Sequence, residues 1–308
     1  MAVKIGIVFL ISVTCAVLLM SLMVGSVTLG LPELISVLTD TPQNSVARTI
    51  LIDIRLPRVL LALLVGAGIS ASGAAIQGLF RNPLADPALI GVSSGAALFA
   101  ALFVVIAGQV PHLIVGMAGS AFVGGMLATW IVLLVGGRGG GISTMLLAGI
   151  AINAIALAGV GLLSYLSTDT QLRSISFWAL GSLNGASWTS VSVAAVIPIV
   201  LYFLYRQSSS LNAMTLGEET AMHLGVSSHF LRIRIVSLTA IAVGIGVALT
   251  GVIAFLGLIV PHLIRMTLGS KHQVVIPASG LLGGLLLLVA DSLSRTIVAP
   301  VELPVGIL

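Results

Sequence analysis

Nine apolar segments of roughly membrane-spanning length constrain the fold of this sequence more than any other feature. They fall at 5–29, 59–79, 89–107, 112–135, 143–166, 189–205, 233–252, 253–268 and 274–290. Each is a continuous apolar run that does not alternate with polar residues, so it predicts a transmembrane helix and excludes a membrane β-barrel. A tenth apolar stretch begins near Leu303, and the sequence ends at Leu308.

The composition supports the same fold class. Of the 308 residues, 58% are hydrophobic and 7% are charged, whereas about a quarter of a typical soluble protein is charged. We therefore expect an all-α polytopic membrane protein in which residues 1–308 form a single transmembrane domain. The net charge of +4 is too small to indicate nucleic-acid binding, and the single cysteine, Cys15, excludes a disulfide within one chain. The first apolar run is too long for a signal peptide and predicts an uncleaved first span.

Proline and glycine interrupt several of the apolar segments, at Pro83, Pro87, Gly257 and Pro261. Broken helices occur at membrane depth only where they are buried in protein or line a water-filled cavity. Small residues are also dense, from Gly66 to Gly73 above all, which indicates closely packed helices.

The distribution of Lys and Arg predicts the orientation. With a cytoplasmic N-terminus and alternating spans, eight basic residues lie inside and five outside, the bias expected of membrane proteins. The inside set is Lys4, Arg81, Arg138, Arg206, Arg232, Arg234, Arg265 and Lys271, and the outside set is Arg48, Arg55, Arg58, Arg173 and Arg295.

A polar stretch, Leu216–Val226, interrupts the apolar pattern within a predicted cytoplasmic loop, 207–231. Glu218 and Glu219 fall where a short helix begins, since helix N-termini favour negative charge. Gly225 is placed to end this helix. Ala221, Met222 and Leu224 predict a small apolar face, which favours a contact with another protein, while a solvated loop without a partner is the alternative.

Several kinds of chemistry have no counterpart in the sequence. It contains no phosphate-binding G-x-x-x-x-G-K-[ST], no H-E-x-x-H, no G-x-S-x-G and no cysteine pair. Asp291, near Arg295, is the only carboxylate near a span interior, whereas a secondary transporter predicts carboxylates within spans or inverted repeats. We expect no catalytic or metal site, and an energy source on another subunit. His262 lies in a span after Pro261 and is interpreted as a structural hydrogen-bonding group.

Three ordered stretches resemble the FecCD-type permease family of ABC importers for iron-siderophores, haem and vitamin B12, the type II importers. The first runs from Arg55-Leu-Pro-Arg58 through Gly73-Ala-Ala-Ile-Gln-Gly78 to Arg81-Asn-Pro-Leu-Ala-Asp-Pro87 and Gly91-Val-Ser-Ser-Gly95. The second is Leu216–Val226. The third is Gly251–Arg265, followed by Ala290-Asp291 to Arg295 and by Glu302-Leu-Pro-Val-Gly306.

The resemblance implies a permease subunit, not an enzyme, in the bacterial inner (cytoplasmic) membrane. The family fold has ten transmembrane helices per subunit, of which the tenth is largely missing here. The implied partners are a second copy of the chain, two ABC ATPase subunits on the cytoplasmic side, a periplasmic substrate-binding protein and membrane lipid. The chain itself would bind no cofactor, because ATP and Mg²⁺ belong to the ATPase.

The resemblance also assigns roles to residues of this sequence. The ATPase-coupling residues would be Leu216, Gly217, Glu218, Glu219, Ala221, Met222, Leu224 and Gly225. A cytoplasmic gate would comprise Asn82, Leu84, Ser143 and Thr144, although Asn82-Pro83 also reads as a simple helix stop. Binding-protein docking would use exposed arginines, Arg55, Arg58 and Arg295, whose alternative is to anchor the chain to lipid headgroups.

The substrate is indicated by the segment 169–182, which most resembles haem and siderophore members of the family. Arg173, suited to propionates, and His112, suited to iron, are candidate substrate contacts, against the alternative of an ordinary surface arginine and histidine. We expect haem or another iron chelate, with vitamin B12 (cobalamin) as the runner-up.

Overall fold

The computed structural model describes residues 2–25, 30, 37, 45–107, 113–137, 141–299 and 301–308, and within these ranges all regular structure is helical. The helices and helical turns are α1 (Ala2–Met23), α3 (Ser45–Arg48), η1 (Thr49–Arg55), α4 (Leu56–Phe80), η2 (Pro87–Ile90), α5 (Val92–Ala107), α6 (Leu113–Gly137), α7 (Gly141–Leu166), α8 (Asp169–Ala179), α9 (Trp188–Ala194), α10 (Val196–Arg206), α11 (Ser208–Thr215), α12 (Glu218–His223), α13 (Ser228–Thr250), α14 (Leu256–Leu268), α15 (His272–Ser294) and η3 (Val305–Ile307).

The predicted fold class is confirmed. Among the described residues, seven helical stretches are long and apolar enough to cross a membrane, and α5 and α14 are shorter apolar helices. Together they account for the nine predicted segments. The boundaries differ in places: the helix predicted at 59–79 belongs to a continuous stretch over Val46–Phe80, and the stretch after Leu303 forms only the short turn η3.

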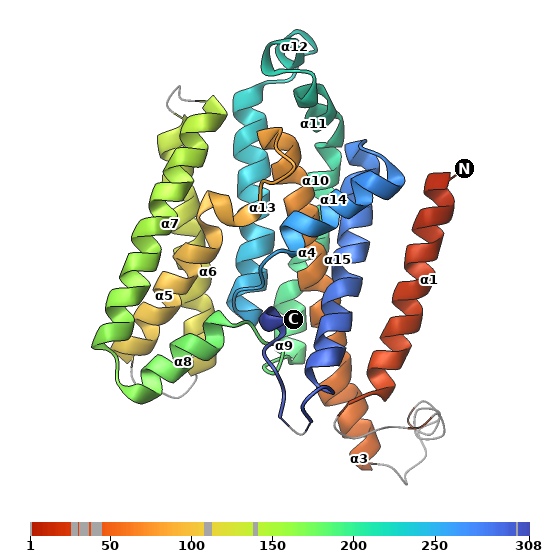
Figure 1. Ribbon diagram of the computed structural model, residues 1–308, viewed down its shortest axis with the longest axis vertical. Helices are drawn as coiled ribbons and strands as arrows, with labels where there is room; N and C mark the ends of the chain where they lie inside the picture. The colour runs from red at the N-terminus through yellow and green to blue at the C-terminus, as the bar shows by residue number, and fades with distance from the viewer. Residues whose placement is uncertain are drawn as a thin grey trace.

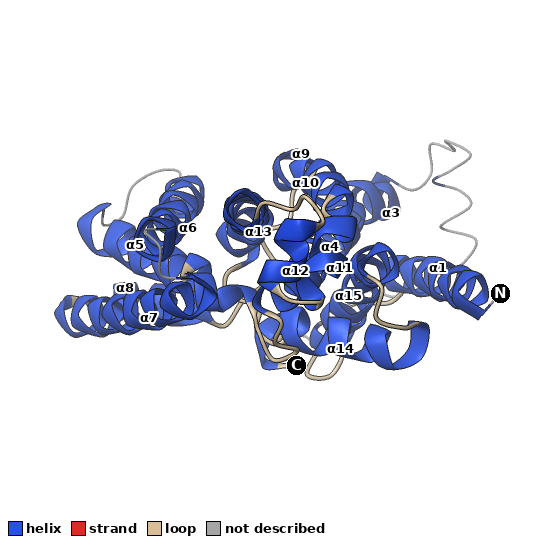
Figure 2. Ribbon diagram, turned by 90° about the horizontal axis from the view of Figure 1, so that it is seen from above, coloured by secondary structure: helices blue, strands red, loops and turns tan. Residues whose placement is uncertain are grey.

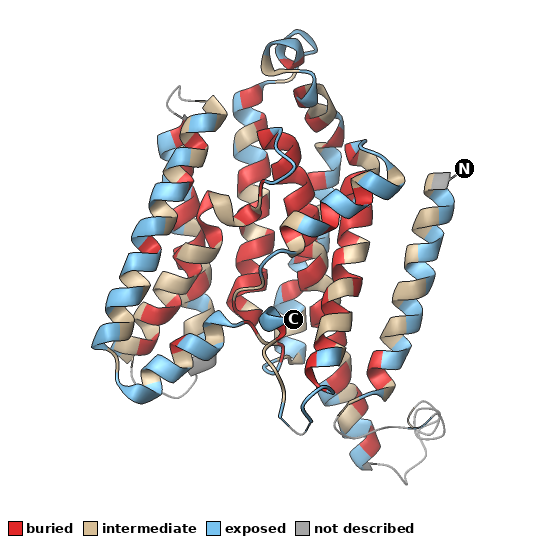
Figure 3. Cartoon of the chain, in the orientation of Figure 1, coloured by how far each residue is buried: buried red, intermediate tan, exposed pale blue. Residues whose placement is uncertain are grey.

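The helices are arranged around α4, which runs through the middle of the molecule and is buried along most of its length (Figures 1 and 3). α13, α14 and α15 pack against α4, while α5, α6 and α7 form a group on one side and α1 lies on the other flank (Figure 2). α1 and α7 are largely exposed. Because exposed apolar helices are unfavourable in water, these faces belong against lipid or another protein chain.

Close helix contacts depend on glycine, as the density of small residues predicts. A Cβ at Gly66 would overlap the carbonyl oxygen of Gly283 on α15, and one at Gly73 would overlap that of Gly257 on α14. Without side chains at these positions the backbones approach each other closely, which strengthens dispersion contacts where water does not drive association.

The break between α13 and α14 is only partly buried: Gly251 is buried, whereas Phe255 is exposed and lines a cavity. Gly251 (φ 73°) ends α13, and α14 starts after Phe255 (φ 65°) partway along the molecule (Figure 1). Pro261 has no N–H to donate to the carbonyl oxygen of Gly257 four residues earlier. The side-chain amide of Gln77 replaces that donor, at 3.3 Å from Gly257 O and 3.1 Å from Leu258 O.

The interpretation of His262 as a structural hydrogen-bonding group is wrong for the single chain. His262 is exposed on α14, and within the described part of the chain its ring makes no hydrogen bond. The structural partner of the proline break is Gln77, which lies on a different helix and so gives no local signal beside Pro261.

Candidate functional site

The two ends of the molecule carry the predicted functional residues. The N-terminus of α1, α11 and α12 lie at one end, and α3, α8 and α9 lie at the other (Figure 1). α11 and α12 fall within the predicted loop 207–231. We call the end with α12 the inner end and the opposite end the outer end.

α12 is a short helix with the predicted boundaries. It begins at Glu218 after Gly217, whose φ of 116° suits glycine. At its C-terminus the N–H of Val226 donates to Ala221 O at 2.9 Å and that of Gly225 (φ 81°) donates to Met222 O at 2.9 Å. These two bonds form a Schellman motif, which fixes the end of the helix.

The predicted apolar face of α12 divides into two parts. Ala221 is fully buried against the protein, whereas Met222 and Leu224 are 55% and 61% exposed, and Leu216 is 66% exposed. An ion pair of 3.8 Å between Glu218 and Arg232 links α12 to α13. α12 is therefore held to the body of the protein. Together with its flanking residues it presents three exposed apolar side chains, which favours a protein contact over a solvated loop.

The predicted gate residues lie in the segment after α4 and at the start of α7. Asn82 Oδ1 accepts a hydrogen bond from Leu84 N at 2.9 Å, so Asn82 does form the predicted helix-stop turn. Leu84 is 71% exposed, and Ser143 is also exposed. Thr144 is partly buried. The gate role stays a prediction, because the four residues would meet only around a dimer axis.

Asn153 of α7, which the sequence did not single out, braces the segment that follows the gate turn. Its Nδ2 donates to Ala88 O at 3.0 Å, and its Oδ1 accepts from Ser94 Oγ. Asp86 caps η2 by accepting from Ala88 N at 2.8 Å. Burial raises the pKa of the Asp86 carboxyl, and the hydrogen bond from Ala88 opposes that shift.

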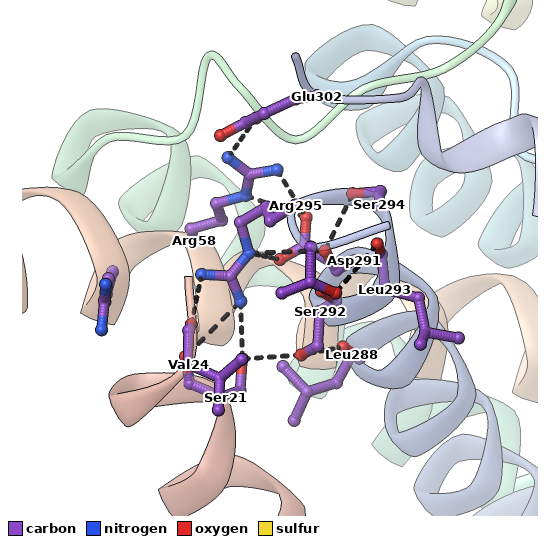
Figure 4. Close-up of polar contacts among 12 residues, drawn as sticks. Ser21, Val24, Arg58, Leu288, Asp291, Ser292, Leu293, Ser294, Arg295 and Glu302 are labelled. Atoms are coloured by element: carbon purple, nitrogen blue, oxygen red, sulfur yellow. Dashed lines mark hydrogen bonds and ion pairs between the residues drawn. The ribbon is translucent and has the colours of Figure 1, made fainter. Parts of the chain in front are cut away.

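At the outer end, three arginines predicted to be exposed are buried instead. Arg55, Arg58 and Arg295 are 4%, 6% and 5% exposed. The Arg58 guanidinium lies 2.8 Å from Asp291 Oδ1 and 2.9 Å from Glu302 Oε2, and Arg295 Nε lies 3.2 Å from Asp291 Oδ2 (Figure 4). We call Arg58, Asp291, Arg295 and Glu302 the outer ion cluster.

Two of these three arginines, Arg55 and Arg295, also cap α1. Arg55 Nη1 donates to the carbonyl oxygens of Leu22 at 2.6 Å and Met23 at 2.9 Å. Arg295 Nη2 donates to Ser21 Oγ at 2.8 Å (Figure 4). The last carbonyls of a helix lack intrahelical donors, and cations near a helix C-terminus are stabilising. The expectation of exposed guanidinium groups is therefore corrected, and so is the alternative of lipid-headgroup anchors.

Of the two candidate substrate contacts, only Arg173 lies among the described residues. Arg173 is exposed on α8, a helix whose Thr168 and Gln171 form a capping box. Gln171 Nε2 also donates to Val104 O at 3.1 Å, which ties α8 to the end of α5. Arg173 is accessible and its role stays a prediction. His112 and Arg138 lie outside the described residues. Among the described residues, no group of three or more His, Cys, Asp or Glu side chains is placed to hold a metal ion.

Comparison with known proteins identifies a matching family and several similar proteins. The model of the FecCD transport family matches residues 13–308. The hemin transport system permease protein HmuU of Yersinia pestis is 46% identical over 299 residues, covering 95% of this chain and 89% of that protein. The vitamin B12 import system permease protein BtuC of Shigella flexneri is 40% identical over 257 residues, covering 83% and 78%.

A solved structure is similar over almost the whole length. It is described as an inward-facing conformation of a metal-chelate type ABC transporter, and it matches with a TM-score of 0.88 and 31% sequence identity. The match covers 98% of this chain and 94% of that one.

Proposed function

This chain belongs to the FecCD transport family, and from that premise we propose that it is the permease subunit of an ATP-driven importer for an iron chelate, haem foremost. The chelate would cross the bacterial inner membrane after delivery by a periplasmic binding protein. The observation that carries this proposal is the 46% identity to a hemin permease over 95% of the chain. The similarity to vitamin B12 permeases makes cobalamin the second candidate.

The inner end supports coupling to an ATPase. α12 is closed at its C-terminus by the Schellman motif, and with its flanking residues it presents Leu216, Met222 and Leu224 to a partner. ATP and Mg²⁺ would bind the ATPase subunits, and the coupling residues Gly217, Glu218, Glu219, Ala221 and Gly225 would shape and hold the contact. A stiff, apolar contact transmits a partner's movement better than a loose polar loop.

The exposed apolar faces support assembly with a second copy of the chain. α7 is long, apolar and mostly exposed, and its first turn carries the gate residues Ser143 and Thr144. Cysteines at positions 82, 84, 143 and 144, in a background without Cys15, should cross-link between subunits with a yield that depends on nucleotide. Absence of any cross-link in every nucleotide state would contradict this gate.

Docking of the binding protein at Arg55, Arg58 and Arg295 requires an exchange of partners. The Glu302 side chain is 28% exposed, whereas Asp291 is fully buried. An acidic group of the binding protein would therefore replace Glu302 on Arg58 and leave the Asp291 pair intact. In this arrangement the N-terminus is cytoplasmic, since α12 faces the ATPase at the same end (Figure 1).

The experiment that tests the substrate compares uptake of two radiolabelled compounds. The chain is expressed with its neighbouring ATPase and binding-protein genes in cells that lack their own haem and cobalamin permeases. We expect haem uptake that stops when the ATPase is inactivated. Uptake of cobalamin alone would favour the second candidate, and uptake of neither by an assembled complex would contradict the proposal.

A further inference from the structure

A large cavity with several polar side chains in its lining opens at the inner end, between the end of α4, α11 and the turn that joins α14 to α15. Its volume is about 760 Å³. The described residues that line it include three cationic side chains, Arg81, Arg265 and Lys271, and no carboxylate. We call this cavity the inner basic pocket.

A hydrogen bond to Gln77 holds the Arg265 guanidinium in place. Its Nη1 donates to Gln77 Oε1. The Gln77 amide is itself anchored to Gly257 O, which the proline break leaves without a donor, and to Leu258 O. Gln77 is only 2% exposed. The guanidinium is thus positioned before any ligand arrives, which lowers the entropy cost of binding.

His272 adds a buried polar atom without a partner. Its ring is 2% exposed, and Nδ1 lies 2.8 Å from Asn212 Oδ1, which also accepts from the His272 backbone N–H. Nδ1 is therefore the donor, and Nε2 remains without a hydrogen bond in the described part of the chain. Buried polar atoms of this kind cost free energy unless something pairs with them.

Arg81 and Lys271 are both exposed and bring further positive charge to the same cavity. Like charges that gather without a carboxylate repel one another, and a bound anion removes that repulsion. A phosphate group suits these donors, because its oxygens accept from a planar guanidinium fork and from an ammonium point charge together. Basic pockets between membrane helices on the cytoplasmic side also bind anionic headgroups.

We propose that the inner basic pocket binds a phosphate group, carried by an anionic phospholipid headgroup or by free inorganic phosphate. The pocket holds the group with the guanidinium of Arg265 and the ammonium of Lys271. This inference does not depend on the chelate that the protein transports.

The test uses the purified full chain and two probes. Binding of radiolabelled inorganic phosphate is measured in detergent, and lipid retention is measured by native mass spectrometry from nanodiscs of phosphatidylcholine with and without phosphatidylglycerol. The variants are Arg265→Gln and Lys271→Gln. The matched control is Arg206→Gln. Arg206 is an exposed arginine at the end of α10, and its Nη1 donates a 3.4 Å hydrogen bond to the Tyr202 hydroxyl.

We expect each pocket variant to weaken binding of at least one probe about tenfold, the effect of losing one charge-assisted hydrogen bond, while Arg206→Gln binds as the wild type does. Binding of inorganic phosphate alone identifies free phosphate as the source, and selective retention of phosphatidylglycerol identifies the lipid. Lys271 lies in an exposed turn, so Lys271→Gln is expected to fold. If Arg265→Gln does not fold, binding by Lys271→Gln tests the proposal.

The proposal is overturned if neither probe binds the wild type more tightly than Lys271→Gln, or if Arg206→Gln loses as much binding. Loss of ATPase co-purification in Lys271→Gln, with neither probe bound, would assign the pocket to an acidic protein surface and would equally overturn the proposal.

Discussion

The inner and outer ends of this protein use arginine in opposite ways. At the outer end, Arg58 and Arg295 share the fully buried Asp291, and Arg55 caps α1. At the inner end, Arg265 and Lys271 line an open cavity that has no carboxylate among its described residues. The number of arginines at an end therefore says little about their role. The partners that the tertiary structure supplies decide whether an arginine stabilises the fold or remains available to a ligand.

The largest effect is expected from removing Asp291, the carboxylate that Arg58 and Arg295 share in the outer ion cluster. Asp291→Ala leaves two buried guanidinium groups without that carboxylate, and breaking a buried pair costs about 3–5 kcal/mol. We expect the free energy of unfolding in detergent to fall by that amount, measured by denaturant titration.

The control for Asp291→Ala is Lys271→Ala, which removes a charge at the inner end and should change stability by less than about 0.5 kcal/mol. Equal stability losses in the two variants would end the contrast between the two ends. Replacing Arg55, Arg58 and Arg295 together by Glu should likewise unfold the protein, so that substitution does not isolate docking.

The next largest effect is expected on α12. Met222→Asp or Leu224→Asp would place an unpaired charge in the proposed ATPase contact, and charges buried in an interface cost several kcal/mol. We expect the ATPase to be lost on co-purification while the permease keeps its oligomeric state. His223→Gln, at an exposed position of the same helix outside the coupling set, should have little effect. Full recovery of the ATPase with either Asp variant would rule out this contact.

A moderate effect should follow from changing Gln77. Gln77→Ala leaves the Gly257 carbonyl without a donor, and a buried unsatisfied group costs about 1–3 kcal/mol. Gln77→Glu keeps an acceptor for Arg265 but loses the donor to the carbonyl oxygens of Gly257 and Leu258. Comparing the two variants therefore separates the contact with Arg265 from the contact with the carbonyls. Thermal unfolding of both variants measures the loss, and a wild-type melting temperature in Gln77→Ala would contradict the role given to this side chain.

The smallest effect is expected for Glu302→Gln. Arg58 keeps Asp291 and loses a partly exposed partner, and such pairs contribute about 0–1 kcal/mol. Because Glu302 competes with the proposed docking partner, the substitution should raise the association rate of the binding protein severalfold at low salt. Surface plasmon resonance measures that rate. A slower association would show that Glu302 assists docking, against the exchange proposed here.

Much of the fold could be read from local sequence. Each of the nine apolar segments corresponds to helix in the structure, because hydropathy and backbone hydrogen bonding act within a segment and leave few alternatives in a membrane. The boundaries of α12 at Glu218 and Gly225 follow from local charge and from glycine's access to positive φ. The ordered motifs indicated the family for the same reason, since each is a short contiguous stretch.

The roles of individual polar side chains were decided only by tertiary structure. Arg58 and Asp291 are 233 residues apart, and Gln77 reaches a carbonyl 180 residues away, so neither pairing leaves a periodic or spacing signal. The three outer arginines looked exposed because span ends usually are, and packing of α1 and α15 buried them. The sequence by itself determined which segments form apolar helices and where α12 begins and ends. The tertiary structure decided which charges are neutralised and which remain open, because that depends on contacts between helices far apart along the chain.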